Sequence, residues 1–468
     1  MARRAHLIGI AGAGMSALAI LLREAGWKIS GSDDNFYDPI YSYLKKNKVL
    51  FFKSYRASNI PRYADLIVIG KHVRLTPENP EVKRALSSGK TIKSLPETLA
   101  MLAEGKEQIV VAGSFGKSTG AALIAWCLVR TKKSPSYFIG AIPEGFNSSH
   151  LGRGKYFVLE GDEYPSAYWD KTSKFLHFDP TSVLLISGEH DHVNVFPTEK
   201  SYKEPYKKLV AKISKYGLLV YSFEGKNLRE ISKYAKSRKV SYALKNKNAD
   251  WYTQNIKYGA QTSFDLIRRG KKVARLRTPL LGNHNIENVV GAGALLLEQK
   301  MIGARDFARG IGSFKGLARR LDLKTKRSSV PVYKGLGSSY TKAKSIFDAL
   351  KLHFSEKRII AVFEPKTFSW RNRFALKWYK SIFDDVSEVI MLPPPAEGKR
   401  THDQLTHQEI FQAIKGRTNS HKARTEKETL AILKKITKKD SIIALVSSGS
   451  LLGLSKSVPK LMEKLFPQ

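Results

Sequence analysis

The residues best suited to chemistry form a short glycine loop that is typical of phosphate binding. An apolar run over 109–111 predicts a buried strand, and a helical apolar pattern over 121–129 follows it. The loop between them contains Gly113, Ser114, Gly116, Lys117, Ser118 and Thr119. Glycines let backbone N–H groups approach phosphate oxygens, and the helix N-terminus adds a positive dipole. We expect Lys117 to reach the β- and γ-phosphates, and a hydroxyl of Ser118 or Thr119 to hold Mg²⁺. The loop is shorter than the full Walker A pattern, which has a further glycine where this chain has a valine.

Acids and histidines follow the next two predicted strands, over 156–159 and 182–186. These side chains are Glu160, Asp162 and Glu163 after the first strand, and Glu189, His190, Asp191 and His192 after the second. Ligands bind at the carboxyl ends of parallel strands, and carboxylates there suit Mg²⁺. The spacing of the two histidines also fits zinc, although no third and fourth zinc ligand stands out. For each acid taken singly, the alternative is a solvated loop charge.

A second glycine turn opens the chain. Residues 6–11 predict a strand and 15–25 a helix, and the segment between them carries Gly12 and Gly14. With Asp33 about twenty positions beyond the turn, this pattern is typical of a nucleotide-binding βαβ unit. Two arginines before the apolar segment imitate a signal peptide, but glycines interrupt its hydrophobic run and favour the turn. No other run is long enough to span a membrane.

An amide-rich segment over 281–288 precedes a helix predicted over 289–299. Its polar members include His284, Asn285 and Asn288. A loop of this kind suits the recognition of a base edge. Helix caps and turn hydrogen bonds are the alternative, which accounts for one asparagine more easily than for three.

The remaining pattern predicts three α/β domains, over 1–107, 108–307 and 308–468. Short alternating runs after position 222 predict antiparallel strands that decorate the second domain: 239–243, 263–267 and 272–276. In the third domain, strands over 359–363, 389–392 and 442–446 alternate with helices. The single cysteine, Cys127, excludes an intrachain disulfide, fits a reducing cytoplasm, and is expected in the core.

The formal net charge is +39 over 468 residues. Such a field attracts nucleic acid, anionic lipid and small anions alike. The lysines are nevertheless spread along the whole chain, without an arginine-rich arm or an RNA-binding aromatic signature. We interpret them as a solvated surface, and we expect no specific nucleic acid partner and no membrane insertion.

Three α/β units in this order, with a nucleotide turn, a phosphate loop and two acidic strand ends, resemble the Mur ligase family. Its members are ATP-dependent ligases that join amino acids or peptides to a UDP-linked muramic acid. The resemblance covers essentially the whole chain and implies a Rossmann-like N-terminal domain, a central ATP-binding domain and a Rossmann-like C-terminal domain. Several stretches resemble the branch that attaches L-alanyl-γ-D-glutamyl-meso-diaminopimelate in peptidoglycan recycling: 31–33, 35–39, 79–82, 140–143, 160–164 and 170–175. The branch that attaches L-alanine shares the loop and the turn, and is the alternative.

The resemblance implies a mechanism as well as a fold. ATP would phosphorylate the carboxylate of UDP-N-acetylmuramate, and the amine of a peptide or amino acid would displace phosphate to form an amide. Glu160 and His192 would bind Mg²⁺, and Arg320 would reach the γ-phosphate from the third domain. The adenine end would contact His284, Asn285 and Asn288. The UDP-sugar would contact Gly12, Ala13, Gly14, Met15, Ser16, Ser32 and Asp33. Lys366 would lie in the peptide pocket, and we expect a monomer or a weak dimer.

The chain departs from the family pattern at three points. Ser187 stands where the family has an asparagine, and Lys366 replaces an arginine that would grip a carboxylate with two hydrogen bonds. Lys334 opens the segment 334–340, where the family has an acid and histidines that help to hold ATP. The lost acid and histidines, together with the net charge, leave a second hypothesis open, namely a protein of the same fold that binds a nucleotide sugar or a polyanion without turnover.

Overall fold

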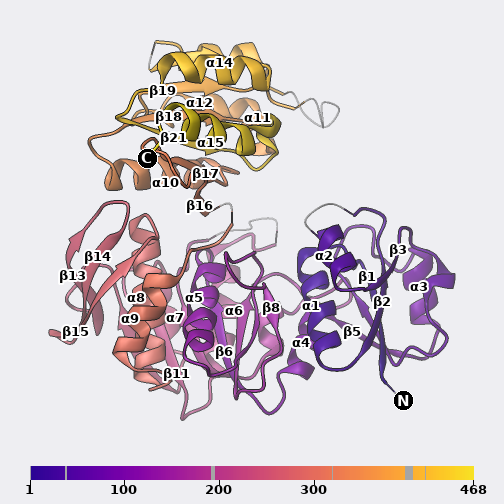
Figure 1. Ribbon diagram of the computed structural model, residues 1–468. Coiled ribbons are helices and arrows are strands. Elements are labelled where there is room, and N and C mark those ends of the chain that lie inside the picture. The colour runs from indigo at the N-terminus through magenta and orange to yellow at the C-terminus, as the bar shows by residue number, and fades with distance from the viewer. Residues whose placement is uncertain (1, 37–39, 191–194, 319, 396–403, 417) are drawn as a thin grey trace. The chain divides into compact units, whose positions relative to one another are not determined.

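The computed structural model describes residues 2–36, 40–190, 195–318, 320–395, 404–416 and 418–468. The chain forms two compact units. The first unit contains residues 1–256, 264–278 and 284–315, and the second contains 257–263, 279–283 and 316–468. Two sheets belong to the first unit and one to the second (Figure 1), which confirms the predicted α/β class.

The first sheet consists of five parallel strands in the order β3-β2-β1-β4-β5, as in a nucleotide-binding fold. Its strands are β1 (Arg4–Ile8), β2 (Lys28–Ser32), β3 (Leu50–Phe52), β4 (Leu66–Ile69) and β5 (Thr91–Ser94). Its helices are α1 (Ala13–Glu24), α2 (Ile40–Lys46), η1 (Ala57–Asn59), α3 (Pro80–Leu86) and α4 (Leu95–Leu102). Asn79 caps α3, and Ser94 with Glu97 forms a capping box at α4, so local sequence sets where both helices begin.

The second sheet has ten strands in the order β15-β14-β13-β12-β11-β10-β6-β9-β7-β8. These strands are β6 (Glu107–Ala112), β7 (Ser136–Phe138), β8 (Ser149–His150), β9 (Tyr156–Gly161), β10 (Pro180–Leu185), β11 (Leu218–Ser222), β12 (Arg238–Tyr242), β13 (Trp251–Lys257), β14 (Thr262–Arg268) and β15 (Lys271–Thr278). The helices are α5 (Lys117–Arg130), η2 (Lys174–His177), α6 (Glu199–Ala211), α7 (Leu228–Ser232), α8 (Asn283–Glu298) and α9 (Ala304–Ser313). Strand β6 lies between β10 and β9, and both neighbours run parallel to it.

Two sequence predictions about this sheet are wrong. Strand β12, predicted to be antiparallel, pairs in parallel with β11 and β13 and extends the main sheet. The short helix α7 between β11 and β12 supplies the crossover that a parallel pair needs, and the sequence pattern did not reveal it. Helix α8 begins at Asn283 rather than at residue 289, so the amide-rich segment forms its first turns instead of a loop.

The third sheet has the order β16-β17-β21-β18-β19-β20, and only β16 among the paired strands is antiparallel. Its strands are β16 (Arg320–Leu323), β17 (Val332–Gly335), β18 (Arg358–Phe363), β19 (Glu388–Met391), β20 (Asn419–Lys422) and β21 (Ser441–Val446). The helices are α10 (Tyr340–His353), α11 (Phe368–Arg371), η3 (Arg373–Ala375), α12 (Leu376–Tyr379), α13 (His407–Ile414), α14 (Glu426–Ile436), η4 (Leu451–Gly453) and α15 (Leu454–Leu465). Successive residues of β18 enter two different core clusters, which explains its unbroken apolar sequence.

Helix α9 (Ala304–Ser313) crosses residue 308, where the sequence predicts the boundary between the second and third domains. This helix belongs to the first unit, where a Cβ atom at Gly310 would lie 2.8 Å from Sγ of Cys127. Cys127 is fully buried, as predicted, and burial raises the pKa of its thiol to about 12. In the part of the chain that the structure describes, no helix combines the length and the hydrophobicity needed to cross a bilayer.

A candidate phosphate-binding site

The predicted phosphate loop lies where three neighbouring strands of the second sheet end together. In the strand register, Ala112 of β6 is paired with Gly161 of β9 on one side and Leu185 of β10 on the other. Parallel strands therefore bring the loop after β6 and the polar segments after β9 and β10 to one edge of the sheet. This is the edge at which open α/β sheets bind ligands.

Gly116 shapes the loop and ends it at the N-terminus of α5. Its φ of +81° lies in the left-handed region, and it precedes the first helical residue, Lys117. A Cβ atom there would lie 2.8 Å from Cγ2 of Ile186 and 2.9 Å from Oδ1 of Asn288, so the site has room only for glycine. Asn288 is thereby placed beside the loop. Within the described chain, the backbone N–H groups of residues 116–118 have no protein acceptor, which leaves them available to a phosphate.

The side chain of Lys117 forms an ion pair with Glu163. Its Nζ lies 2.5 Å from Oε2 of the carboxylate, whose side chain is fully buried, while the lysine side chain is 14% exposed. A buried carboxylate is stable as an anion only when cations and hydrogen-bond donors compensate it. Glu163 therefore holds the ammonium group at the base of the loop. The sequence pattern had placed Glu163 in an acidic cluster without giving it this function.

Glu160 connects the first turn of α5 to the segment after β7. Its Oε1 accepts a hydrogen bond of 2.8 Å from the Ser118 hydroxyl, and its Oε2 accepts one of 2.6 Å from the backbone N–H of Gly140. A hydroxyl and a carboxylate side by side are the hard oxygen ligands that Mg²⁺ prefers. Ser118 and Thr119 are both buried, and of these two predicted hydroxyl ligands it is Ser118 that bonds the acid. No cluster of three or more metal-ligating side chains occurs among the described residues, which exclude 191–194.

Asp162 is bound to a lysine of its own segment rather than to the loop. Lys174 donates a hydrogen bond of 2.6 Å to its carboxylate. Burial acts to raise the pKa of Asp162, but the charges of Lys174 and Lys117 outweigh it and lower that pKa. The three acids at the end of β9 and just after it thus bond different residues: Glu160 bonds Ser118 and Gly140, Asp162 bonds Lys174, and Glu163 bonds Lys117.

Two tyrosines of α6 form a chain of hydroxyl contacts that ends on the loop, and the sequence patterns did not identify them. The Ser114 hydroxyl donates to the backbone carbonyl of Glu189 at 2.6 Å and lies 2.8 Å from the hydroxyl of Tyr202, which is 3.0 Å from that of Tyr206. Ser187, which replaces the family's asparagine, accepts from the N–H of Phe115 at 2.7 Å. The spacing of four between the tyrosines on a helix was the available signal.

The glycine turn of the first sheet is organised by Asp33. Its Oδ2 accepts a hydrogen bond of 3.0 Å from the N–H of Ala11, and its Oδ1 accepts one of 3.0 Å from the Tyr55 hydroxyl. The hydroxyls of Ser16 and Ser32 donate to the Ala13 carbonyl and to Glu81, respectively. The candidate substrate residues Gly12, Ala13, Gly14 and Met15 lie at the cap and first turn of α1.

The remaining candidate residues are not assembled around the loop by the described structure. His192 falls outside the described residues. His284 is exposed and Asn285 is half-buried in the first turn of α8. Arg320 and Lys366 belong to the second unit, where Arg320 is exposed at the start of β16 and Lys366 follows β18.

Lys334 is buried in β17 of the second unit and donates a hydrogen bond of 2.8 Å to the hydroxyl of Ser455 in α15. In the same unit, Glu364 accepts hydrogen bonds from the Ser447 hydroxyl at 2.5 Å and from the Leu451 N–H at 3.1 Å. The carboxyl edge of the third sheet is therefore held together by polar side chains, with a lysine where the family pattern has an acid.

Comparison with known proteins identifies the family of this chain. The model of the Mur ligase family catalytic domain matches residues 4–107, and the model of the Mur ligase middle domain matches residues 111–296. The UDP-N-acetylmuramate–L-alanyl-γ-D-glutamyl-meso-2,6-diaminoheptandioate ligase of Escherichia coli (strain K12) is 30% identical, over 84% of this chain and 85% of its own. This chain belongs to the Mur ligase family.

Other members of the family are nearly as similar to this Mur ligase. The UDP-N-acetylmuramate–L-alanine ligase of Dictyoglomus turgidum is 29% identical, over 88% of this chain and 86% of its own. The crystal structure of the UDP-N-acetylmuramate–alanine ligase of Thermotoga maritima covers 99% of both chains with a TM-score of 0.77 at 20% identity. The predicted three-domain α/β architecture is thereby confirmed, whereas the domain boundaries and the roles of the site residues stay predictions.

Proposed function

We propose that this Mur ligase joins L-alanyl-γ-D-glutamyl-meso-diaminopimelate to UDP-N-acetylmuramate at the expense of ATP. The arrangement of Lys117, Ser118 and Glu160 at one sheet edge carries the proposal, because it puts a cation, a hydroxyl and a carboxylate beside unbonded loop N–H groups. The Escherichia coli relative named for this tripeptide supports the choice of amine. The L-alanine ligase relatives make L-alanine the second candidate amine.

The residues of the loop account for the first half of the reaction. The N–H groups of residues 116–118 and the ammonium of Lys117 would bind the β- and γ-phosphates of ATP. When the muramate carboxylate attacks the γ-phosphorus, the bond to the β,γ-bridging oxygen breaks, and ADP leaves as an acyl phosphate forms. Lys117 would stay beside Glu163 throughout, because an ammonium group has three donors and the ion pair uses one.

Ser118 and Glu160 are the described residues that would hold Mg²⁺, and His192 is the candidate for a second ion. A bound Mg²⁺ supplies charge neutralisation between the phosphate oxygens and the attacking carboxylate. In the second half of the reaction, the free amine of the tripeptide attacks the acyl carbon and phosphate leaves. By the family resemblance, Arg320 would act at the γ-phosphate in the first half, and Lys366 would act at the peptide in the second half.

The test is a phosphate-release assay with the purified chain, ATP, Mg²⁺, UDP-N-acetylmuramate and one amine at a time. We expect phosphate release that depends on both the muramate and the tripeptide, with a lower kcat/KM for L-alanine. A preference for L-alanine assigns the protein to the other branch. Absence of release with every amine contradicts the ligase proposal.

Lys334 supports one alternative, which is binding without turnover. Its buried ammonium puts a positive charge where the family pattern has an acid, and Ser455 accepts one of its hydrogen bonds. On this hypothesis UDP-N-acetylmuramate raises the melting temperature while ATP is not consumed. The Lys334→Asp variant separates the two cases, because it restores the family's acid and creates turnover only if that acid is what the chain lacks.

A further inference from the structure

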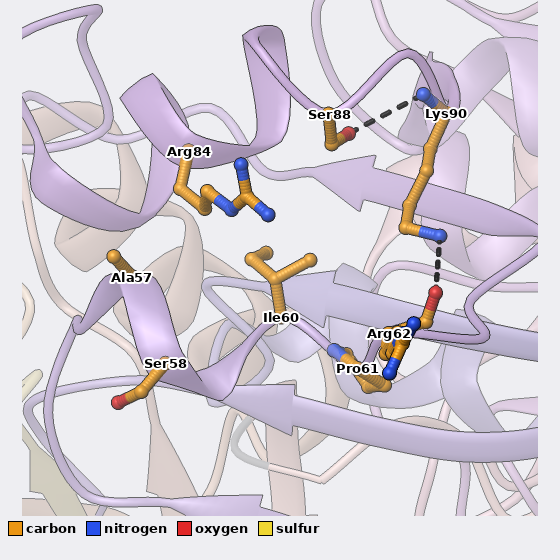
Figure 2. A pocket seen from close by; sticks show the side chains of 8 residues that line it. All are labelled: Ala57, Ser58, Ile60, Pro61, Arg62, Arg84, Ser88 and Lys90. Carbon is orange, nitrogen blue, oxygen red and sulfur yellow. Dashed lines mark hydrogen bonds between the residues drawn. The ribbon is translucent and has the colours of Figure 1, made fainter.

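A basic hollow lies at the amino edge of the first sheet, away from the glycine turn. Its wall is formed by η1 with the segment that leads to β4, and by the end of α3 with the segment that leads to β5 (Figure 2). The glycine turn and Asp33 instead follow the carboxyl ends of β1 and β2. Because all five strands are parallel, these two places are opposite edges of one sheet. The hollow is thus separate from the candidate sugar-nucleotide site.

Three cations and two hydroxyls line the hollow: Arg62, Arg84, Lys90, Ser58 and Ser88. Its volume is about 590 Å³, within the range of roughly 300–1,000 Å³ typical of small-molecule sites. Figure 2 shows Arg84 reaching from the end of α3 toward Ile60, with Arg62 and Lys90 on the other side of that residue. No carboxylate lies among the lining residues.

The ammonium group of Lys90 is fixed in place rather than freely solvated. It donates hydrogen bonds of 2.8 Å to the carbonyl of Arg62 and 3.0 Å to that of Ala64. The guanidinium groups of Arg62 and Arg84 have no carboxylate partner in the part of the chain that the structure describes. An ammonium has a third donor after its two carbonyl bonds, and each guanidinium has five N–H groups.

Acids are few around these cations, and none of them lines the hollow. Residues 53–93 contain nine Lys and Arg against three Asp and Glu. One of the three, Glu81, is fully buried and is bonded to His6, Ser32 and Asn59. An interaction with the dipole of α3 would explain Arg84 in its last turn, but not Arg62 and Lys90, which come from other segments. The two carbonyl bonds of Lys90 fix its ammonium group at the wall of the hollow, between the segments that carry the two arginines.

We propose that this hollow binds a small molecule through a phosphoryl group held by Arg62, Arg84 and Lys90. Planar guanidinium groups match the geometry of phosphate oxygens and bond them in pairs. Ile60, which lies between the cations, offers an apolar surface to the body of the ligand. This site does not take part in the ligase reaction. Its ligand would bind the first sheet at the edge opposite the candidate sugar-nucleotide site.

The first experiment uses the unaltered full-length chain and arginine modification by phenylglyoxal, read by peptide mass spectrometry. The probes are inorganic phosphate and pyrophosphate at physiological salt. We expect saturating pyrophosphate to slow modification of Arg62 and Arg84 by about tenfold, since charge-assisted hydrogen bonds to phosphate oxygens occupy the guanidinium N–H groups. Arg23 and Arg153, which are exposed and do not line the hollow, serve as internal controls and should not change. Equal protection of all four arginines, or none, overturns the proposal.

The second experiment compares pyrophosphate affinity by calorimetry for two charge-matched double variants. Arg62→Gln with Arg84→Gln should weaken binding at the hollow about tenfold, whereas Arg23→Gln with Arg153→Gln should change it less than twofold. Lys117 is intact in both proteins, so the phosphate loop contributes equally to both titrations. Equal weakening would mean that net charge alone attracts the anion.

If a short single-stranded RNA protects the arginines better than pyrophosphate, the hollow belongs to a polyanion surface and the small-molecule assignment is wrong. Should the first variant fail to fold, the modification experiment on the unaltered chain still decides.

Discussion

The first unit contains two strand–glycine–helix connections, which differ in the groups that the nearby carboxylates bond. At the turn after β1, Asp33 accepts a hydrogen bond from the backbone N–H of Ala11, so a protein anion occupies a donor of the turn. At the loop after β6, Glu160 and Glu163 bond the side chains of Ser118 and Lys117 and leave the loop N–H groups to a ligand. The two connections share a local fold and differ in how the acids use its donors, which is consistent with the proposed sugar nucleotide at one and the proposed triphosphate at the other.

The largest expected effect comes from breaking the ion pair at the loop. Lys117→Met should abolish ATP turnover and lower the free energy of unfolding by about 3 kcal/mol, because it leaves the fully buried carboxylate of Glu163 without its cation. The double variant Lys117→Met with Glu163→Gln should recover most of the stability and none of the turnover. Chemical denaturation and phosphate release measure the two effects separately. Equal stability of the single and the double variant would contradict a stabilising function of the pair.

Removal of the acid beside Ser118 should have the next largest effect. We expect Glu160→Gln to lower kcat about 100-fold and to raise the Mg²⁺ concentration needed for half-maximal rate, since it removes a charged oxygen ligand. Mg²⁺ titrations of the rate measure both changes. Glu163→Gln is the matched control, because it removes an acid of the same segment whose oxygen bonds Lys117 instead. An unchanged Mg²⁺ dependence in Glu160→Gln would show that this acid does not hold the ion.

The glycines of the two connections provide a third test. Both Gly9 and Gly116 have positive φ, +87° and +81°, so alanine should destabilise the fold by about 1–2 kcal/mol at either position. Only Gly116→Ala should also weaken ATP binding, because its Cβ would press against Asn288 beside the loop. Thermal unfolding and binding of a fluorescent ATP analogue give the two readouts. Gly12→Ala is the control, since Gly12 has a φ of −66° and an ordinary backbone conformation.

The smallest expected effect is at the turn of the first sheet. Asp33→Asn keeps a hydrogen-bond acceptor for Ala11 and removes only the charge, so we expect the KM for UDP-N-acetylmuramate to change about three- to tenfold with kcat for ATP turnover nearly constant. Steady-state kinetics with varied UDP-N-acetylmuramate measure this. A fall in kcat that equals the change in KM would mean that Asp33 acts beyond substrate binding.

Local patterns predicted the elements of this chain well and their pairing less well. The helix at Pro80 follows from Asn79 and the proline, and β6 with α5 follows from an apolar run broken by glycine. The direction of β12 did not follow, because the five-residue helix α7 is too short to show a period. The start of α8 was placed too late, since asparagines favour loops in sequence statistics while tertiary packing of Asn288 beside Gly116 retains them in a helix.

The sequence by itself determined which residues are available for chemistry: the glycine loop, the acids after two strands and the cation at Lys117. Only the tertiary structure decided how the acids are shared, with Glu160 bonded to Ser118, Glu163 to Lys117 and Asp162 to Lys174. Likewise, nothing local indicated that Arg62, Arg84 and Lys90 line one hollow. The physical reason is that spacing along a strand or helix fixes which residues share a face, whereas the pairing of charges depends on which segments the sheet register brings to the same edge.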